Sequence, residues 1–171
     1  ELIEAGKVLV SGAVADKPAR LVDPGDPVLV TVDGPRFVSR GGEKLDAALH
    51  RFGIDVAGRR VVDAGASTGG FTDCVLQRGA LEVVAIDVGH GQLHERIRTD
   101  PRVDVRERAN VRHLGLGDIG RPAQLVVADL SFISLRAVLP NLVAMADAGA
   151  DLVVLVKPQF EAGRAEANKG R

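Results

Sequence analysis

Four ionisable side chains follow short apolar runs along the chain. Asp63, Asp87 and Asp129 each close a run of Val, Ile, Leu and Ala residues, and Lys157 closes the last run. Residues that follow parallel strands gather at one edge of a sheet, where ligands bind in open α/β folds. A single Asp after a strand is often only a turn former or a helix cap. Four such groups at one edge instead predict a binding or catalytic site.

The most specific string spans residues 62–72, where an apolar run leads directly into a glycine-rich turn. The turn contains Gly65, Gly69 and Gly70, and a helix is predicted to follow it. Glycine lets the backbone approach a ligand closely, and unpaired amides at the start of a helix bind polar groups. Asp87 follows after about 20 residues, where a carboxylate accepts hydrogen bonds from a ribose diol. The string therefore predicts an adenosine-containing cofactor.

The glycine spacing separates two classes of cofactor. A dinucleotide fingerprint requires G-x-G-x-x-G, which differs from the spacing found here. Asp63, two residues before the first glycine, would repel a pyrophosphate but suits the ammonium of an amino-acid moiety. D-x-G-x-x-x-G-G is the pattern of S-adenosylmethionine enzymes, so this cofactor is favoured over NAD. The predicted cofactor-binding residues are Asp63, Gly65, Ser67, Thr68, Gly69, Gly70, Phe71, Asp87, Asn110 and Asp129.

Short apolar runs alternate with amphipathic segments from residue 59 onward. Strands are expected at residues 60–63, 83–87, 103–105, 125–129 and 152–156. Helices are expected at residues 71–78, 92–98 and 134–146, with Pro140 kinking or restarting the last one. This alternation predicts an α/β fold: a doubly wound, Rossmann-like parallel sheet with helices on both faces.

The first 34 residues follow a different pattern. β-Branched runs at residues 8–10 and 28–32 are separated by turn-forming residues, which predicts a small β unit. A basic linker follows, with one amphipathic helix after Ser39. The predicted divisions of the chain are residues 1–34, 35–58 and 59–171.

Five strings resemble the TlyA family, also called the hemolysin A proteins. In order along the chain they are VSRGGEKL (38–45), DAGASTGGFT (63–72), DVGHGQ (87–92), VADLSFIS (127–134) and VKPQFE (156–161). Members of that family join an S-four-type RNA-binding module to an FtsJ-like methyltransferase domain, and methylate the 2'-hydroxyl of cytidines in 16S or 23S ribosomal RNA. The resemblance covers essentially the whole chain. It implies that residues 1–33 are the second half of a small α+β RNA-binding module, that S-adenosylmethionine is the cofactor, and that ribosomal RNA or a ribosomal subunit is the partner.

The resemblance also implies a catalytic Lys, Asp, Lys and Glu set. Three positions map to Lys44, Asp129 and Lys157; the Glu is expected beyond Arg171 in a longer protein, and Glu161 is not its counterpart. Methyl transfer to a ribose requires in-line approach and removal of a weakly acidic proton. A lysine acts as a base where burial and a neighbouring cation favour its neutral form. Lys157 is therefore assigned as the base, Lys44 as the neighbouring cation and Asp129 as the group that orients the amines.

Basic residues near the linker are candidates for contacts with RNA phosphates. Residues 1–34 carry a net charge of −3 and residues 35–60 one of +3, although the chain as a whole carries −1. An exposed helix face would have the same composition, so the alternative of a merely solvated surface stays open. The predicted RNA-binding residues are Lys7, Arg36, Arg40 and Arg59, with Arg51 and Arg60 as further candidates.

The composition argues against several other classes of protein. The apolar fraction of 46% and charged fraction of 26% are those of a folded globular chain. The chain has one cysteine, Cys74, which excludes a disulfide framework, so a cytoplasmic location is expected. Its four His form no cluster at zinc-ligand spacing, so no bound metal is expected. No apolar run approaches the ~20 residues that span a bilayer. Five Phe, without Trp or Tyr, predict that RNA is recognised by backbone and shape more than by base stacking.

Three alternatives to the methyltransferase remain. A non-catalytic RNA-binding or ribosome-assembly factor is disfavoured by the complete set of Lys44, Asp129 and Lys157. A membrane-active hemolysin is disfavoured because long apolar segments and strongly basic amphipathic helices are lacking. A nucleotide-dependent oxidoreductase is disfavoured by the glycine spacing. The sequence leaves open the target nucleotide, the need for an intact subunit and the oligomeric state.

Overall fold

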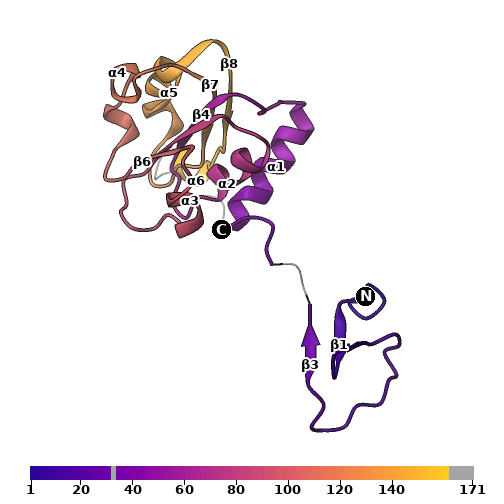
Figure 1. Ribbon diagram of the computed structural model, residues 1–171. Coiled ribbons are helices and arrows are strands. Elements are labelled where there is room, and N and C mark those ends of the chain that lie inside the picture. Colours follow the sequence, from indigo (N-terminus) through magenta and orange to yellow (C-terminus); the bar gives the residue numbers. More distant parts are fainter. Residues whose placement is uncertain (32–33, 162–171) are drawn as a thin grey trace. The chain divides into compact units, whose positions relative to one another are not determined.

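The computed structural model describes residues 1–31 and 34–161, and Figure 1 shows its ribbon. The chain divides into two compact units, Glu1–Arg36 and Phe37–Arg171. Helix α1 (Arg40–Phe52), predicted in the basic linker, belongs to the second unit because its Leu45 and Leu49 are buried in the core that also contains α2. Residues 162–171, the end of the predicted methyltransferase region, lie outside the described residues.

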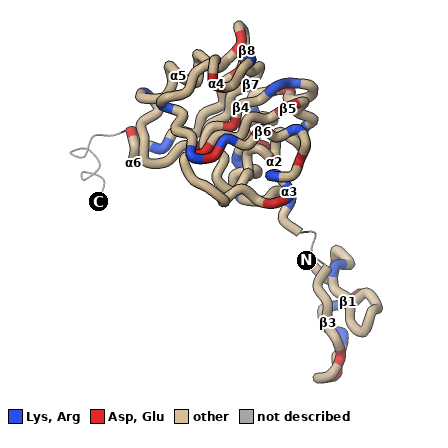
Figure 2. The backbone as a smooth tube through the Cα atoms, turned by 60° about the vertical axis from the view of Figure 1, so that its left-hand side comes forward, with Lys and Arg blue, Asp and Glu red and all other residues tan. Residues whose placement is uncertain are grey.

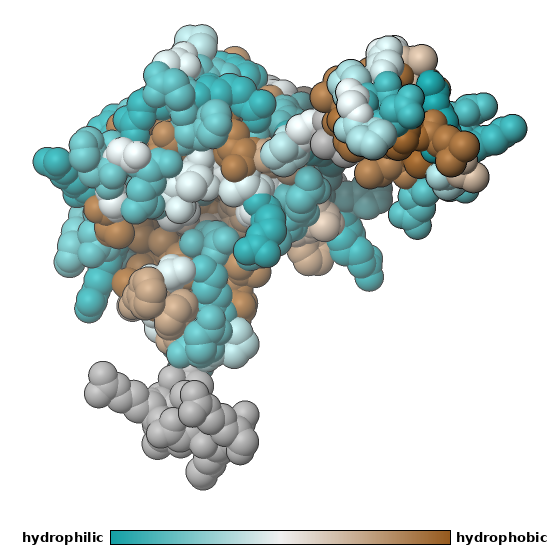
Figure 3. Space-filling view, turned by 90° about the horizontal axis from the view of Figure 1, so that it is seen from below, coloured by the Kyte–Doolittle hydropathy of each residue, from teal (hydrophilic) through white to brown (hydrophobic). Residues whose placement is uncertain are grey.

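The first unit contains a three-stranded antiparallel sheet. Strand β1 (Val8–Val10) lies between β2 (Ala13–Val14) and β3 (Val28–Val30). The two β-branched runs therefore form strands, while Val32, predicted to extend the second one, lies outside the described residues. Many apolar side chains of this unit are exposed, including all three of β3, and brown groups are visible on its surface in Figure 3.

The second unit is built on five parallel strands. Their spatial order is β6 (Val103–Arg106), β5 (Glu82–Ile86), β4 (Arg60–Ala64), β7 (Ala123–Ala128) and β8 (Ala146–Val154). The chain adds β5 and β6 on one side of β4 and then returns to add β7 and β8 on the other. This reversal makes a topological switch point at the carboxyl ends of β4 and β7, which is where open α/β sheets bind ligands.

Alternate residues of the central strands face opposite sides of the sheet, and both sides are covered. Val61 packs in a core cluster with α1 and α2 (Gly70–Gln77), and this cluster includes the fully buried Cys74. Val62 packs on the other side, in a cluster with Leu142 of α5 (Leu139–Met145). Figure 1 shows helices on both faces. The predicted doubly wound α/β fold is therefore confirmed.

Several elements differ in extent from the predictions. Helix α3 covers only Glu95–Arg98, and β8 begins directly after α5. The predicted helix 134–146 divides into the 3₁₀ helix η2 (Leu135–Ala137) and α5, with Pro140 in the first turn of α5, where a missing N–H is tolerated. The 3₁₀ helix η1 (Val111–His113) and α4 (Leu116–Ile119) were not predicted, because such short elements show no periodicity.

Acidic and basic residues are interspersed along the backbone of the second unit (Figure 2), and many of their side chains pair. Arg60, at the start of β4, is only 6% exposed. Its guanidinium donates to the carbonyl of Ile119 at 2.8 Å and lies 3.2 Å from Glu82. The charge of Arg60, one of the basic residues near the linker, is therefore paired inside the second unit.

Candidate active site

Two adjoining cavities, each of about 460 Å³, lie at the carboxyl edge of the parallel sheet. They share wall residues from the glycine turn and from the loop after β7: Gly65, Ser67, Asp129 and Ser131. The first cavity is completed by the start of α1 and by Lys157, and the second by the loops after β5 and β6. The pair has the size and polarity of a site for two ligands that meet at the shared wall.

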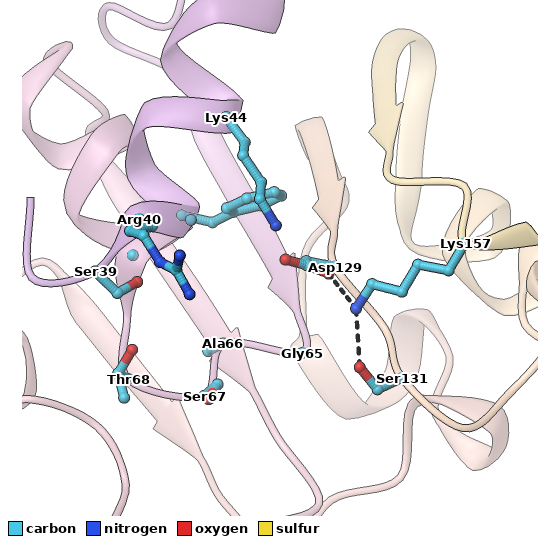
Figure 4. Close-up of a pocket in the computed structure, with 13 residues that line it drawn as sticks. Ser39, Arg40, Lys44, Gly65, Ala66, Ser67, Thr68, Asp129, Ser131 and Lys157 are labelled. Atoms are coloured by element: carbon cyan, nitrogen blue, oxygen red, sulfur yellow. Dashed lines mark hydrogen bonds and ion pairs between the residues drawn. The ribbon is translucent and has the colours of Figure 1, made fainter. Parts of the chain in front are cut away.

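The first cavity brings the three predicted catalytic residues together (Figure 4). Lys157 Nζ lies 2.5 Å from Asp129 Oδ1 and donates a hydrogen bond of 2.8 Å to Ser131 Oγ. Lys44 extends from α1, and its amine points toward Asp129. The side chains of Lys157 and Asp129 are each 21% exposed, so a ligand entering the cavity would reach both.

The glycine turn forms the floor between the cavities. Gly65 has a φ of +89°, and a Cβ at this position would lie 2.9 Å from the backbone oxygen of Asp129. Gly69, with φ +94°, is the N-cap of α2, and a Cβ on Gly70 would collide with Ser39 Oγ. Glycine is required at the turn because the neighbouring backbone comes so close. Thr68 and Phe71 complete this part of the first cavity wall.

Both polar and apolar side chains line the second cavity. Asp87 accepts the Ser67 N–H through Oδ2 at 2.7 Å and the Gly89 N–H through Oδ1 at 2.6 Å, which joins the glycine turn to the loop after β5. Asn110 lines the same cavity and accepts the N–H of Arg112 at 3.0 Å as the N-cap of η1. Apolar residues complete the wall: Ile86, Val88, Val111, Leu130 and Ile133.

Asp63 lies beneath the glycine turn and outside the walls of both cavities. Its side chain is fully buried, and Oδ2 accepts the Thr72 hydroxyl at 2.6 Å. Burial raises the pKa of Asp63 to about 7. Oδ1 has no hydrogen-bond partner among the described residues. Asp63 was predicted to bind the ammonium of a ligand, but the glycine turn lies between its carboxyl and the cavities. The group that contacts the Asp63 carboxyl directly is the Thr72 hydroxyl.

Comparison of the sequence with known protein families agrees with the parallel sheet and the residues that line the two cavities. Residues 37–171 match the family described as FtsJ-like methyltransferase. The chain belongs to the FtsJ-like methyltransferase family. The resemblance to TlyA proteins, based on the five strings, is confirmed by relatives of high identity.

Three relatives of this FtsJ-like methyltransferase illustrate the match. The Mycobacterium tuberculosis protein named 16S/23S rRNA (cytidine-2'-O)-methyltransferase TlyA is 56% identical, over 99% of this chain and 64% of the relative. Hemolysin A of Brachyspira hyodysenteriae is 40% identical, over 99% of this chain and 71% of the relative. A solved structure described as a hemolysin from Streptococcus thermophilus is 43% identical, with a TM-score of 0.75, over 95% of this chain and 60% of that one. The chain thus spans less than two thirds of the length of the first and third of these proteins.

The predicted RNA-binding residues are divided between the two compact units of the chain. Arg40 lines the first cavity at the start of α1, whereas Lys7 and Arg36 lie in the first unit. Arg59 directly precedes β4 and pairs with Asp151 at 2.6 Å, and Arg60 is buried at the start of that strand. Arg59 and Arg60 are therefore not at the mouth of the cavities, because residues before a parallel strand lie at the opposite edge from residues after it.

Sequence reasoning missed Glu107, which fixes the loop after β5. Its carboxylate contacts His90 Nδ1 and the Gly91 N–H, each at 2.8 Å, and pairs with Arg98. Arg98 is the main reason that the pKa of Glu107 is lowered to about 2. Glu107 directly follows β6, which ends one residue later than the expected strand 103–105, so the rule that singled out Asp87 and Asp129 stopped one residue short of it.

Sequence reasoning also missed three polar residues that line the cavities: Ser39, Ser131 and Gln92. Hydroxyl and amide side chains in loops carry no distinct sequence signal. Among residues 1–31 and 34–161, no group of three His, Cys, Asp or Glu side chains could hold a metal ion. Within the same residues, no helix has the length and apolar character needed to cross a membrane.

Proposed function

We propose that this chain carries the core of an S-adenosylmethionine-dependent methyltransferase that modifies the 2'-hydroxyl of cytidine in 16S or 23S ribosomal RNA. The observation that carries the proposal is the Lys157–Asp129 pair, with Lys44 opposite it, in a cavity that adjoins a second cavity of suitable chemistry for a nucleoside. The names of the relatives support the choice of ribosomal RNA and of cytidine. Activity on ribosomal RNA would place the protein in the cytoplasm.

The residues of the two cavities fit S-adenosylmethionine. Asp87 would bind the ribose diol, and Asn110 with Ile86 and Val111 would hold the adenine ring. The glycine turn with Ser67, Thr68 and the start of α2 would hold the amino-acid end, and a bound ammonium there would favour the carboxylate form of Asp63 beneath the turn. The crowding at Gly65 supports a close approach of backbone to ligand, since any side chain would meet Asp129. When bound, the cofactor supplies an electrophilic methyl group.

The residues of the first cavity would remove the proton of the target hydroxyl. In its neutral form, Lys157 accepts this proton while the oxygen attacks in line. Asp129 and Ser131 hold Nζ in place. The cation of Lys44 on the other side would stabilise negative charge that develops on the oxygen.

The remaining parts would bind the RNA. The first unit would act as part of an S-four-type module, with contacts to phosphates from Lys7 and Arg36. Arg40, at the rim of the first cavity, would bind a phosphate next to the target nucleotide. The scarcity of aromatic rings favours recognition by backbone and shape.

The test is transfer of labelled methyl from S-adenosylmethionine to ribosomal RNA by the full-length protein, with naked RNA and isolated subunits as substrates. Lys157→Ala is expected to abolish transfer and leave cofactor affinity largely unchanged. Arg102→Ala, which removes a cation just before β6 at the opposite sheet edge, is the matched control and should retain activity. Absence of transfer by the wild type would refute the function, and a non-catalytic RNA-binding factor would then be favoured. Activity of Lys157→Ala would refute only the choice of base.

A further inference from the structure

Two loop segments that follow neighbouring strands contact each other at three places. Residues 129–135 follow β7, and residues 157–161 follow β8 and include α6 (Pro158–Glu161). Lys157 contacts Asp129 and Ser131, the rings of Phe160 and Phe132 lie 5.4 Å apart, and Glu161 contacts Ser134 and Leu135. We call this set of contacts the clasp. It fixes the segment that carries Lys157 on the loop that carries Asp129.

Glu161 makes two hydrogen bonds at the end of the clasp. Oε2 accepts the Ser134 hydroxyl and Oε1 accepts the Leu135 N–H, both at 2.7 Å. These bonds lower the pKa of Glu161, so the side chain is a carboxylate at neutral pH. Leu135 is itself buried in the core cluster under α5. The carboxylate therefore ties α6 to an element that the hydrophobic core holds in place.

The other two contacts of the clasp are weaker anchors. The ring of Phe132 is 92% exposed, and its backbone has the positive φ of 63°, which is unfavourable for a bulky residue. The contact between Lys157 and Asp129 depends on the charge of the amine, and a neutral amine loses the Coulombic part of that attraction. A base must be neutral when it takes a proton. Among the described contacts of the clasp, the bonds of Glu161 are the ones that both reach the buried core and do not depend on the charge of Lys157.

We propose that Glu161 is a positioning residue for methyl transfer. It keeps the segment of Lys157 against the loop of Asp129 and Ser131 while the amine is neutral, and it acts through Lys157 without contacting the substrate. The inference rests on the proposed function of Lys157 as the base. It differs from the role of the fourth catalytic residue expected from the family, since Glu161 points to the start of η2.

The test compares variants of the full-length protein by kcat, KM for ribosomal RNA and cofactor affinity. Glu161→Ala should lower kcat by about 10- to 100-fold, the usual effect of losing a group that orients a functional residue, with much smaller changes in KM and cofactor affinity. Glu161→Gln should restore most of kcat, because its amide can still accept the Leu135 N–H and donate to Ser134 Oγ. Glu82→Ala is the matched control: it removes a carboxylate that pairs with Arg60 and Arg121 at the opposite sheet edge, and should leave kcat unchanged.

A second measurement separates this inference from the proposed function. Hydrogen exchange of the Leu135 amide should become faster in Glu161→Ala and stay unchanged in Glu82→Ala. If the wild type transfers no methyl group, the proposed function fails, and unchanged exchange would refute the clasp as well. If the wild type is active, an unchanged kcat in Glu161→Ala overturns the positioning role. Should Glu161→Ala fail to fold, Ser134→Ala removes one of the two bonds and should give an intermediate loss of kcat; wild-type kcat in that variant would also count against the proposal.

Discussion

Thr72 donates its hydroxyl to the buried carboxyl of Asp63 across 2.6 Å, from the first turn of α2 to the end of β4. Burial raises the pKa of Asp63 from 3.8 to about 7. The unfolded chain releases this proton near the lower value and the folded chain near the higher one. Between them the folded state binds more protons, so the contribution of Asp63 to stability falls as pH rises.

Asp63→Asn should remove this pH dependence. The free energy of unfolding of the wild type should fall relative to that of the variant between pH 4 and 7, by up to about 4 kcal/mol at about 1.4 kcal/mol per pKa unit. Urea unfolding at several pH values measures the difference, and Asp104→Asn, which removes a partly exposed carboxylate on β6, serves as the comparison. A difference between wild type and Asp63→Asn that is constant across this pH range would contradict the assignment.

Gly65→Ala should weaken cofactor binding by at least about tenfold, because the new methyl group must displace the backbone of Asp129 at the wall shared by both cavities. Gly120→Ala is a matched control: Gly120 also has a positive φ, +77°, but a Cβ there meets nothing within 4 Å. Both variants should also lose stability, because an Ala side chain is strained at a positive φ. Calorimetric titration with S-adenosylmethionine distinguishes them, and equal affinities would show that the crowding at Gly65 is unimportant.

Asp87→Asn should lower cofactor affinity by about 10- to 100-fold, since this carboxylate both lines the second cavity and holds the amides of Ser67 and Gly89. Asp100→Asn provides the comparison: Asp100 also accepts a backbone N–H, from Arg102 at 2.9 Å, but lies before β6 at the opposite edge. Its affinity should match the wild type. Wild-type affinity in Asp87→Asn would remove this residue from the cofactor site.

Arg40→Ala should weaken binding to ribosomal RNA and reduce the slope of log affinity against log salt by about 1, as expected for one lost phosphate contact. Arg59→Ala should change neither quantity, because Arg59 pairs with Asp151 and lies away from the cavities. Filter binding at several salt concentrations measures both variants. Equal losses in the two would indicate a diffuse electrostatic effect in place of a contact at the cavity rim.

The strands and their edge residues could be predicted from the sequence because β-branched runs buried on both faces have a clear pattern. Val62 and Val126 lie in continuous apolar runs, and Asp129 follows the second one directly. The short helices and the start of β8 could not be predicted, since Gly149, which has the sequence character of a helix stop, lies inside β8 and not at the end of α5.

Whether an individual side chain is buried or lines a cavity could not be predicted from the sequence either. Asp63 and Asp87 both close apolar runs in the sequence, yet Asp63 pairs with Ala85 inside β4 and is buried, whereas Asp87 follows the end of β5 and reaches a cavity wall. Arg40 and Arg59 both belong to the basic part of the chain, but only Arg40 lies at the rim. Glu161 had no assigned role because its partners, Ser134 and Leu135, come close only through the pairing of β7 with β8.

Cys74 is the one cysteine of the 171 residues, and its side chain is wholly buried between α2 and the sheet. An alkylating reagent therefore reaches this thiol only when the layer of α1 and α2 separates from the strands. The labelling rate of the native chain reports how often that layer opens, without any introduced probe. A ligand bound in the adjoining cavities would stabilise α2 and slow the alkylation of Cys74. The labelling rate would thus report occupancy of the site.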